Sequence, residues 1–171
     1  VRKYLAIVHG EISDNAGIIT GAIGRDKVDR KKMSVTADGK PAVTEFKVLE
    51  RFKNFTYIEC KLQTGRTHQI RAHLKEIGFS IVCDPLYSGN QKPVRLSDIK
   101  RKWNGDVDEE NPLLSRLALH AYSLAINHPR TSERMTFTAP YPRDMEAVRK
   151  QLAKLFKVDP LAPKDADANE A

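Results

Sequence analysis

The sequence predicts an α+β fold, in which a mainly antiparallel sheet carries a few packed helices. Several short segments alternate apolar and polar residues with the period of a β-strand. Two others carry apolar residues at helical spacing. Turn-forming residues join two of the predicted strands, 117–126 and 135–139, as a hairpin across 128–132, which favours antiparallel neighbours.

The first half of the chain is predicted to be mostly strands. In chain order we expect strands at 2–9, 18–23, 43–49 and 55–62, an exposed basic loop at 25–32 and a tight turn at 38–41. After Gly65 the period changes, and Ile70, Leu74 and Ile77 form one stripe of a helix. Thr67 is suited to cap the start of this helix, and Gly78 its end.

The second half is predicted to contain a long polar segment, a hairpin and a second helix. A short strand at 79–82 precedes a surface insertion at 88–115 with a short helix near 98–103. Pro142 fits the first turn of a helix. That helix would bury a stripe of apolar residues, namely Met145, Val148, Leu152 and Leu155. We expect one domain over 1–157 and a disordered tail over 158–171, since the tail has little to bury.

The charge balance favours a polyanionic partner such as nucleic acid. The chain has 29 Lys and Arg against 22 Asp and Glu, a net charge of +7. The predicted tail is acidic, so the excess on the folded domain is larger than this net charge. A solvated basic surface is the alternative interpretation. No apolar run is long enough to span a membrane, and no signal peptide is visible. The two cysteines lack metal-ligand spacing, so we expect no metal site and a cytoplasmic protein.

The segment 62–74 is the most informative for chemistry. A strand ends, Gly65 permits a tight turn and a helix begins, which gathers backbone N–H groups and a positive helix end at one point. Arg66 lies at this junction, where a guanidinium can hold a carboxylate or a phosphate. His68, Arg71 and Lys75 fall on a second side of the helix. The alternatives are that His68 and Gln69 satisfy local backbone groups and that Arg71 and Lys75 form a solvated face.

The wording of this segment resembles the motif of the RluA-type RNA pseudouridine synthases, which carry a stretch close to L-x-T-G-R-T-H-Q-I-R-x-H-L. Four further blocks resemble the family in the same order along the chain. They are 3–10 around Tyr4, 78–87, the late hairpin at 117–122 with 128–131, and 137–142. The resemblance covers roughly residues 1–155 and implies a pseudouridine synthase-like fold.

The resemblance implies a reaction and a set of site residues. The family isomerises uridine to pseudouridine in structured RNA, ribosomal or transfer RNA, without metal or organic cofactor, on a base flipped out of its stack. By position, Arg66 would pair with the nucleophilic aspartate, Tyr4 would contact the flipped base and help to remove the C5 proton, and Leu62 would line the base pocket. A group of basic residues would contact RNA: Lys3, Arg71, Lys75, Lys31 and Lys32.

One part of the family pattern is missing from the chain. The nucleophile of the family lies in a motif like H-R-L-D-x-x-T-S-G, before the Tyr-bearing strand, and no aspartate here lies in such a context. We therefore expect this chain to be the C-terminal part of a catalytic domain, a monomer, and inactive by itself. Two alternatives remain: a non-catalytic RNA-binding module of the same fold, and a basic α+β protein with no role in RNA.

Overall fold

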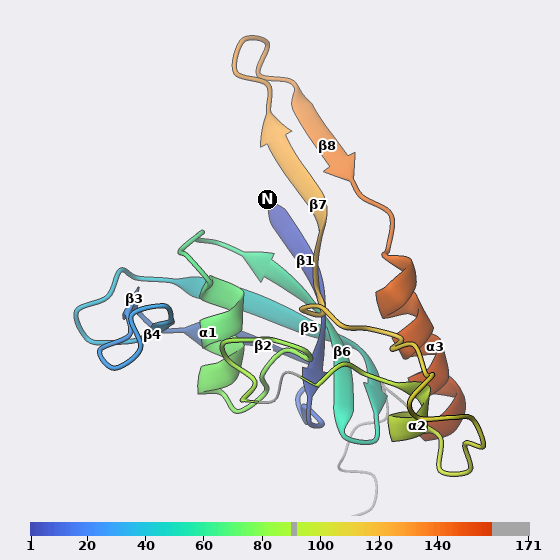
Figure 1. Ribbon diagram of the computed structural model, residues 1–171. Helices are drawn as coiled ribbons and strands as arrows, with labels where there is room; N and C mark the ends of the chain where they lie inside the picture. Colours follow the sequence, from blue (N-terminus) through green and yellow to red (C-terminus); the bar gives the residue numbers. More distant parts are fainter. Residues whose placement is uncertain (90–91, 159–171) are drawn as a thin grey trace, which may run out of the picture.

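An antiparallel sheet organises the molecule and confirms the α+β prediction. The computed structural model describes residues 1–89 and 92–158 (Figure 1). The strand order is β2-β5-β6-β1-β7-β8, and β9 pairs with β5. The strands of this sheet are β1 (Arg2–His9), β2 (Ala16–Thr20), β5 (Val43–Phe52), β6 (Phe55–Leu62), β7 (Leu119–Asn127), β8 (Arg134–Thr138) and β9 (Lys157–Val158). A separate ribbon pairs β3 (Ile23–Arg25) with β4 (Met33–Val35).

Two helices cover opposite faces of the sheet. Helix α1 (Gln69–Glu76) lies on the face to which Thr44 of β5 points, since its His73 is hydrogen-bonded to Thr44. A register shift between Val48 and Glu50 reverses the faces of the sheet to which the later side chains of β5 point. Glu50 thereby faces α3 (Arg143–Phe156) on the other side, where it pairs with Arg149. The β7–β8 hairpin extends away from the rest of the sheet (Figure 1).

The two predicted helices are confirmed, and each loses the last residue of its predicted stripe. Met145, Val148 and Leu152 of α3 are buried as expected, whereas Leu155 is 38% exposed. In α1 the final residue, Ile77, is 37% exposed because the helix ends at Glu76 and Ile77 is its C-cap.

The end of α1 also confirms the role expected of Gly78. Its φ of 88° is the left-handed conformation that glycine adopts readily. Its N–H donates to Lys75 O, and the N–H of Phe79 donates to Leu74 O. These two bonds form a Schellman motif, which satisfies carbonyls that the end of the helix leaves open.

Three local predictions are wrong. The strand predicted at 18–23 is two strands in two sheets, since the chain leaves the main sheet after Thr20. The segment 79–82 is not a strand and makes one bridge, between Ile81 and Val8. Thr67 does not cap α1: the N-cap residue is His68, with a φ of 53° and no capping bond from its side chain. The strand predicted at 18–23 breaks where the chain turns toward α1. This break is a tertiary effect, which the periodicity of the sequence does not record.

The segment predicted as a surface insertion is partly a core element. Val94, Ile99 and Leu114 are each no more than 9% exposed and belong to the main hydrophobic cluster. Val94 and Leu114 are also joined by a backbone bridge. The short helix expected near 98–103 is α2 (Leu96–Ile99). The apolar residues here are too widely spaced to reveal either period, so the sequence alone reads as a loop.

The first residue of the predicted tail, Val158, lies in a strand. Val158 belongs to β9 and pairs with Arg51 of β5. Residues 159–171, the rest of the tail predicted to be disordered, lie outside the described residues. Among the helices that the structure describes, none has the length and apolar character needed to cross a membrane.

Candidate functional site

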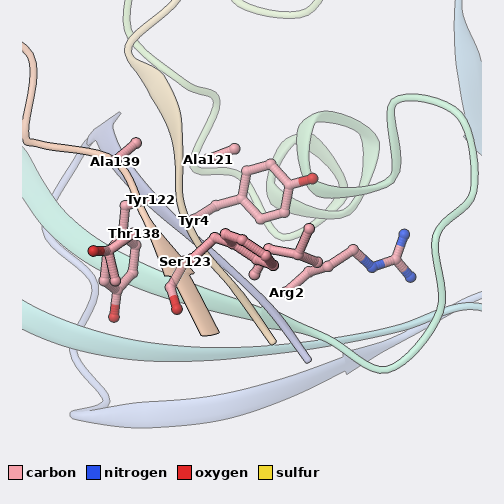
Figure 2. Close-up of a pocket in the computed structure, with 9 residues that line it drawn as sticks. Arg2, Tyr4, Ala121, Tyr122, Ser123, Thr138 and Ala139 are labelled. Carbon is pink, nitrogen blue, oxygen red and sulfur yellow. The ribbon is translucent and has the colours of Figure 1, made fainter. Parts of the chain in front are cut away.

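The predicted base-contacting residue, Tyr4, lies at a cavity on the α1 side of the sheet. Strand pairing places Tyr4 opposite Cys60 and Arg2 opposite Leu62, so all four side chains share one face. The cavity has a volume of about 310 Å³, and Figure 2 shows the Tyr4 hydroxyl and the Arg2 side chain extending in the same direction there. Its lining residues come from two neighbouring strands, β1 and β7, and from the end of β8 with the residue after it: Arg2, Tyr4, Ala121, Tyr122, Ser123, Leu124, Phe137, Thr138 and Ala139.

Leu62 shares this face with Tyr4 but does not line the cavity. It is half-buried and packs against the main hydrophobic cluster, next to Arg2 in the strand pairing. The predicted role of Leu62 in a base pocket therefore stays a prediction. Leu62 lies on the same face of the sheet as Tyr4, one residue pair further along that face.

Arg66 is exposed at the turn between β6 and α1. Its backbone N–H donates to Oε1 of Gln69 at 3.0 Å, and its Nε donates to Pro41 O at 3.0 Å. A side chain at Gly65 would place its Cβ 2.2 Å from Nη1 of Arg2. The end of the Arg2 side chain thus lies directly against Gly65, which connects the turn to the strand that carries Tyr4.

A chain of buried hydrogen bonds holds this turn to the sheet. Gln69 is 2% exposed, and its amide donates to Val43 O and to Thr44 Oγ1, both at 3.0 Å. The Thr44 hydroxyl donates in turn to Nδ1 of His73 at 2.9 Å, because Nε2 of His73 donates to Gly21 O at 3.0 Å. The expectation that polar residues near the helix start satisfy local groups is confirmed for Gln69. These four hydrogen bonds thus fix the turn that carries Arg66 to the sheet.

The structure places Arg71 in a largely buried ion pair in the interior, and its predicted contact with RNA stays a prediction. Its Nε and Nη2 donate to the two carboxylate oxygens of Asp84 at 2.8 and 2.7 Å. The two side chains are 13% and 0% exposed. Burial acts to raise the pKa of Asp84, but hydrogen bonds from Arg71, Leu86 and Tyr87 outweigh it and hold the pKa below its usual value. The Nε–Nη2 edge of this guanidinium is therefore engaged as a structural donor.

Tyr87 connects α1 to the β3–β4 ribbon. Its hydroxyl accepts the N–H of Met33 at 2.8 Å and lies 2.9 Å from Nδ1 of His68. Burial and then the charge of Arg71 lower the pKa of His68, which keeps its ring neutral and able to accept from Tyr87. The Arg71 guanidinium lies 4.9 Å from the centre of the Tyr87 ring. These contacts hold the ribbon against the helix that carries Arg66.

The lysines predicted to contact RNA are placed in different surroundings. The ammonium of Lys3 lies 3.3 Å from Glu59, on the face of the sheet opposite Tyr4, and the Tyr122 hydroxyl donates to the same Glu59. Lys3 is thus an ion-pair partner away from the Tyr4 cavity. Lys32 lies 3.8 Å from Asp29. Lys31 and Lys75 are exposed and remain candidates for RNA contact.

Tyr4 and Arg66, the two predicted catalytic residues, line separate cavities. Arg66 borders a second cavity of about 410 Å³ beneath the β3–β4 ribbon, and Arg2 with Gly65 lies between the two. Among the described aspartates, Asp38 is the one that lines the cavity of Arg66. In residues 1–89 and 92–158, no three or more His, Cys, Asp or Glu side chains gather in a way that could hold a metal.

Sequence reasoning missed the residues that position the site. It assigned no role to a set of buried or bridging side chains: Arg2, Thr44, His73, Asp84 and Tyr87. Two of these carry a recognisable signal, since a histidine on the buried side of an amphipathic helix and an aspartate within an apolar block both need partners. Identifying those partners requires the fold, because they lie at least 13 residues away along the chain.

The comparisons with known proteins agree with the fold and the motif. A family model described as RNA pseudouridylate synthase matches residues 1–76. An uncharacterized RNA pseudouridine synthase of Bacillus subtilis is 50% identical over 153 residues, which are 90% of this chain and 44% of that protein. Ribosomal large subunit pseudouridine synthase D of Neisseria meningitidis is 43% identical over 147 residues, 84% of this chain and 36% of that protein.

Among solved structures, human RNA pseudouridylate synthase domain containing 1 has the same fold. Its TM-score is 0.62 at 28% identity, over 82% of this chain and 54% of that one. The chain therefore spans less than half the length of the two relatives named above.

Proposed function

Since the chain belongs to the RluA-type RNA pseudouridine synthase family, we propose that the whole protein containing it converts uridine to pseudouridine in structured RNA. One observation carries the proposal: Tyr4 faces a cavity of about 310 Å³ immediately beside the turn that presents Arg66. The strong basic excess of the chain supports RNA as the substrate class.

The chemistry divides between this chain and the rest of the protein. An aspartate from outside the chain acts as the nucleophile, and Arg66 keeps that carboxylate ionised and oriented. The C1′–N1 bond of the target uridine breaks, the base turns, and a C1′–C5 bond forms. Tyr4 contacts the flipped base and helps to remove the C5 proton, for which its hydroxyl is placed at the cavity.

The finer features of the proposal concern the substrate and the setting. The names of relatives such as the Neisseria meningitidis protein refer to the large ribosomal subunit, which favours ribosomal over transfer RNA. We further propose a monomer that acts in the cytoplasm. Both cysteines are buried and free, which agrees with a reducing compartment.

The proposal is tested by tritium release from RNA that contains [5-³H]uridine. The whole protein should release tritium from ribosomal RNA, whereas the 171-residue chain alone should release none, since it lacks the aspartate motif. Turnover by the chain alone would show that the nucleophile lies within it. Absence of turnover by the whole protein, together with salt-dependent RNA binding, would favour a non-catalytic RNA-binding module instead.

A further inference from the structure

A second cavity beside Arg66 has the character of an anion site. It measures about 410 Å³ and lies between the β3–β4 ribbon, the turn at 38–40 and the turn at 65–67. Three cationic side chains line it: Arg25, Lys40 and Arg66. Asp38 is the carboxylate among its lining residues, so the lining carries more positive than negative charge.

The walls of this cavity are held in place before any ligand arrives. The backbones of Ile23 and Lys40 exchange two hydrogen bonds of 2.9 Å. A Cβ at Gly39 would lie 2.6 Å from the carbonyl carbon of Ile23, and a Cβ at Gly24 would lie 2.6 Å from Oγ1 of Thr36. The Gly39 contact is with backbone, so only glycine fits there, and the ribbon and the turn pack tightly. The Tyr87 hydroxyl joins the same ribbon to α1, and the cavity is therefore preformed.

The two arginines are oriented by carbonyl oxygens. Nη1 of Arg25 donates to Arg30 O at 3.1 Å, and Nε of Arg66 donates to Pro41 O at 3.0 Å. A carbonyl fixes the direction of a guanidinium without neutralising its charge. The backbone N–H of Asp38, the Thr36 hydroxyl and then the charge of Lys27 lower the pKa of Asp38, so its carboxylate stays ionised and offsets one of the cations. With Arg66 assigned to the nucleophile, Arg25 and Lys40 still outnumber Asp38, and this excess of positive charge is available to an incoming anion.

We propose that this cavity binds a backbone phosphate of the RNA next to the target uridine, held by Arg25 and Lys40. The inference rests on the proposed function, because it takes RNA as the ligand. Gly65 lines this cavity and lies against Arg2, which lines the Tyr4 cavity, so the phosphate would lie next to the region where the base would enter. Contacts from Arg and Lys to a phosphate fix register and orientation without reading a base. The site accordingly positions the strand, while the Tyr4 cavity receives the base.

The test compares matched pairs of charge removals in the whole protein. The site variant is Arg25→Gln with Lys40→Gln. The control variant, Arg101→Gln with Lys102→Gln, removes the same charge from two exposed residues that follow α2, far from the ribbon (Figure 1). Binding to a short stem-loop RNA with one uridine in its loop is measured by fluorescence anisotropy across a salt series. Thermal unfolding of each variant and tritium release by the wild type are recorded in parallel.

The site variant should lose one phosphate contact, which reduces the slope of log Kd against log salt concentration by about 0.9. Its loss of affinity relative to wild type should then shrink by about threefold between about 50 and 200 mM salt. The control variant should lose less affinity for the RNA than the site variant. A methylphosphonate at the contacted position of the RNA should weaken binding by the wild type but not by the site variant.

Different results would overturn different claims. If the wild type releases tritium and the site variant keeps the salt slope of the control, the phosphate site is wrong and the proposed function stands. A site variant that loses turnover with no change in slope likewise overturns it, since the residues then act on chemistry. If the wild type shows neither turnover nor salt-dependent binding, the proposed function itself fails. Because Arg25 supports its own loop, Lys40→Gln alone serves if the double variant unfolds, with half of the charge removed.

Discussion

Replacement of Asp84 by Asn tests whether the buried Arg71–Asp84 pair is structural. In the native protein, Oδ1 of Asp84 accepts from Arg71 Nη2 and from the backbone N–H groups of Leu86 and Tyr87, while Oδ2 accepts from Arg71 Nε. An asparagine can keep its oxygen at the first position, but its NH₂ group then faces the Nε–H of Arg71. Turning the amide over removes the acceptor from the two backbone donors. Neither orientation satisfies the site.

The magnitude follows from the burial of both partners. Asp84 is fully buried and the Arg71 side chain is 13% exposed, so the variant leaves a charged guanidinium without a counter-ion in the interior. Breaking such a buried pair costs about 3–5 kcal/mol. For a protein of this length, that corresponds to a fall in Tm of about 6–20 °C.

The assay is thermal unfolding at pH 7, with Asp144→Asn as the matched control. Asp144 also makes a two-pronged pair, with Arg116 at 2.7 and 2.8 Å, but the two side chains are 32% and 47% exposed. Exposed pairs contribute at most about 1 kcal/mol, so the control should lose no more than about 4 °C. Equal losses in the two variants would refute the assignment of Arg71 to the interior.

The same pair predicts a pH dependence. The folded-state pKa of Asp84 lies below its ordinary value, so its contribution is complete above the unfolded pKa of about 3.9 and is lost as pH falls through the folded value. The destabilisation caused by Asp84→Asn should therefore be largest near pH 7 and shrink in acid. A difference between the variant and the wild type that is independent of pH down to the acid limit of the native state would contradict this reasoning.

Three further predictions concern the site. Arg66→Ala in the whole protein should lower turnover by about 10²-fold or more while Tm changes little, since the exposed side chain loses one bond, to Pro41 O; retained turnover would contradict its role. Tyr4→Phe should lower kcat by about 10²-fold or more with Kd for RNA nearly unchanged, and a change confined to Kd would argue against proton transfer. Tyr87→Phe should cost about 1–3 kcal/mol in a urea titration by leaving the Met33 N–H without its acceptor, and an unchanged midpoint would contradict this.

Sequence periodicity is sufficient for the elements that bury one face along their whole length. Strand β6 is confirmed, with Ile58 and Cys60 of one face fully buried, and α3 buries Met145 and Leu152 at helical spacing. Periodicity fails where tertiary contacts decide. The apolar residue Ile81 makes a single bridge to β1. Leu114 is buried although it belongs to a segment whose sequence predicts a polar loop. In both cases the partner lies far away in the chain, so the local pattern carries no record of it.

The candidate site divides in the same way. The motif around Gly65 correctly predicts a turn that presents Arg66, because glycine and helix-start chemistry are local. The motif also contains Gln69, Arg71 and His73, and resemblance alone cannot separate residues that touch a substrate from residues that hold the turn. The hydrogen bonds separate them, since all three have buried side-chain partners. Arg66 does not, and its guanidinium faces a cavity.

The structural residues of the motif explain how Arg66 can be exposed and yet held in a fixed position. A guanidinium on a free loop would lose side-chain and backbone entropy on each binding event, which weakens any contact it makes. Here Gln69 accepts the N–H of Arg66 and is itself bonded to Thr44, and Thr44 is bonded to His73, whose ring ends on Gly21 O. The cost of ordering the turn is therefore met during folding. Thr44→Val, which cannot bridge Gln69 and His73, should accordingly weaken both stability and turnover, whereas a purely local role for the motif predicts a loss of stability alone.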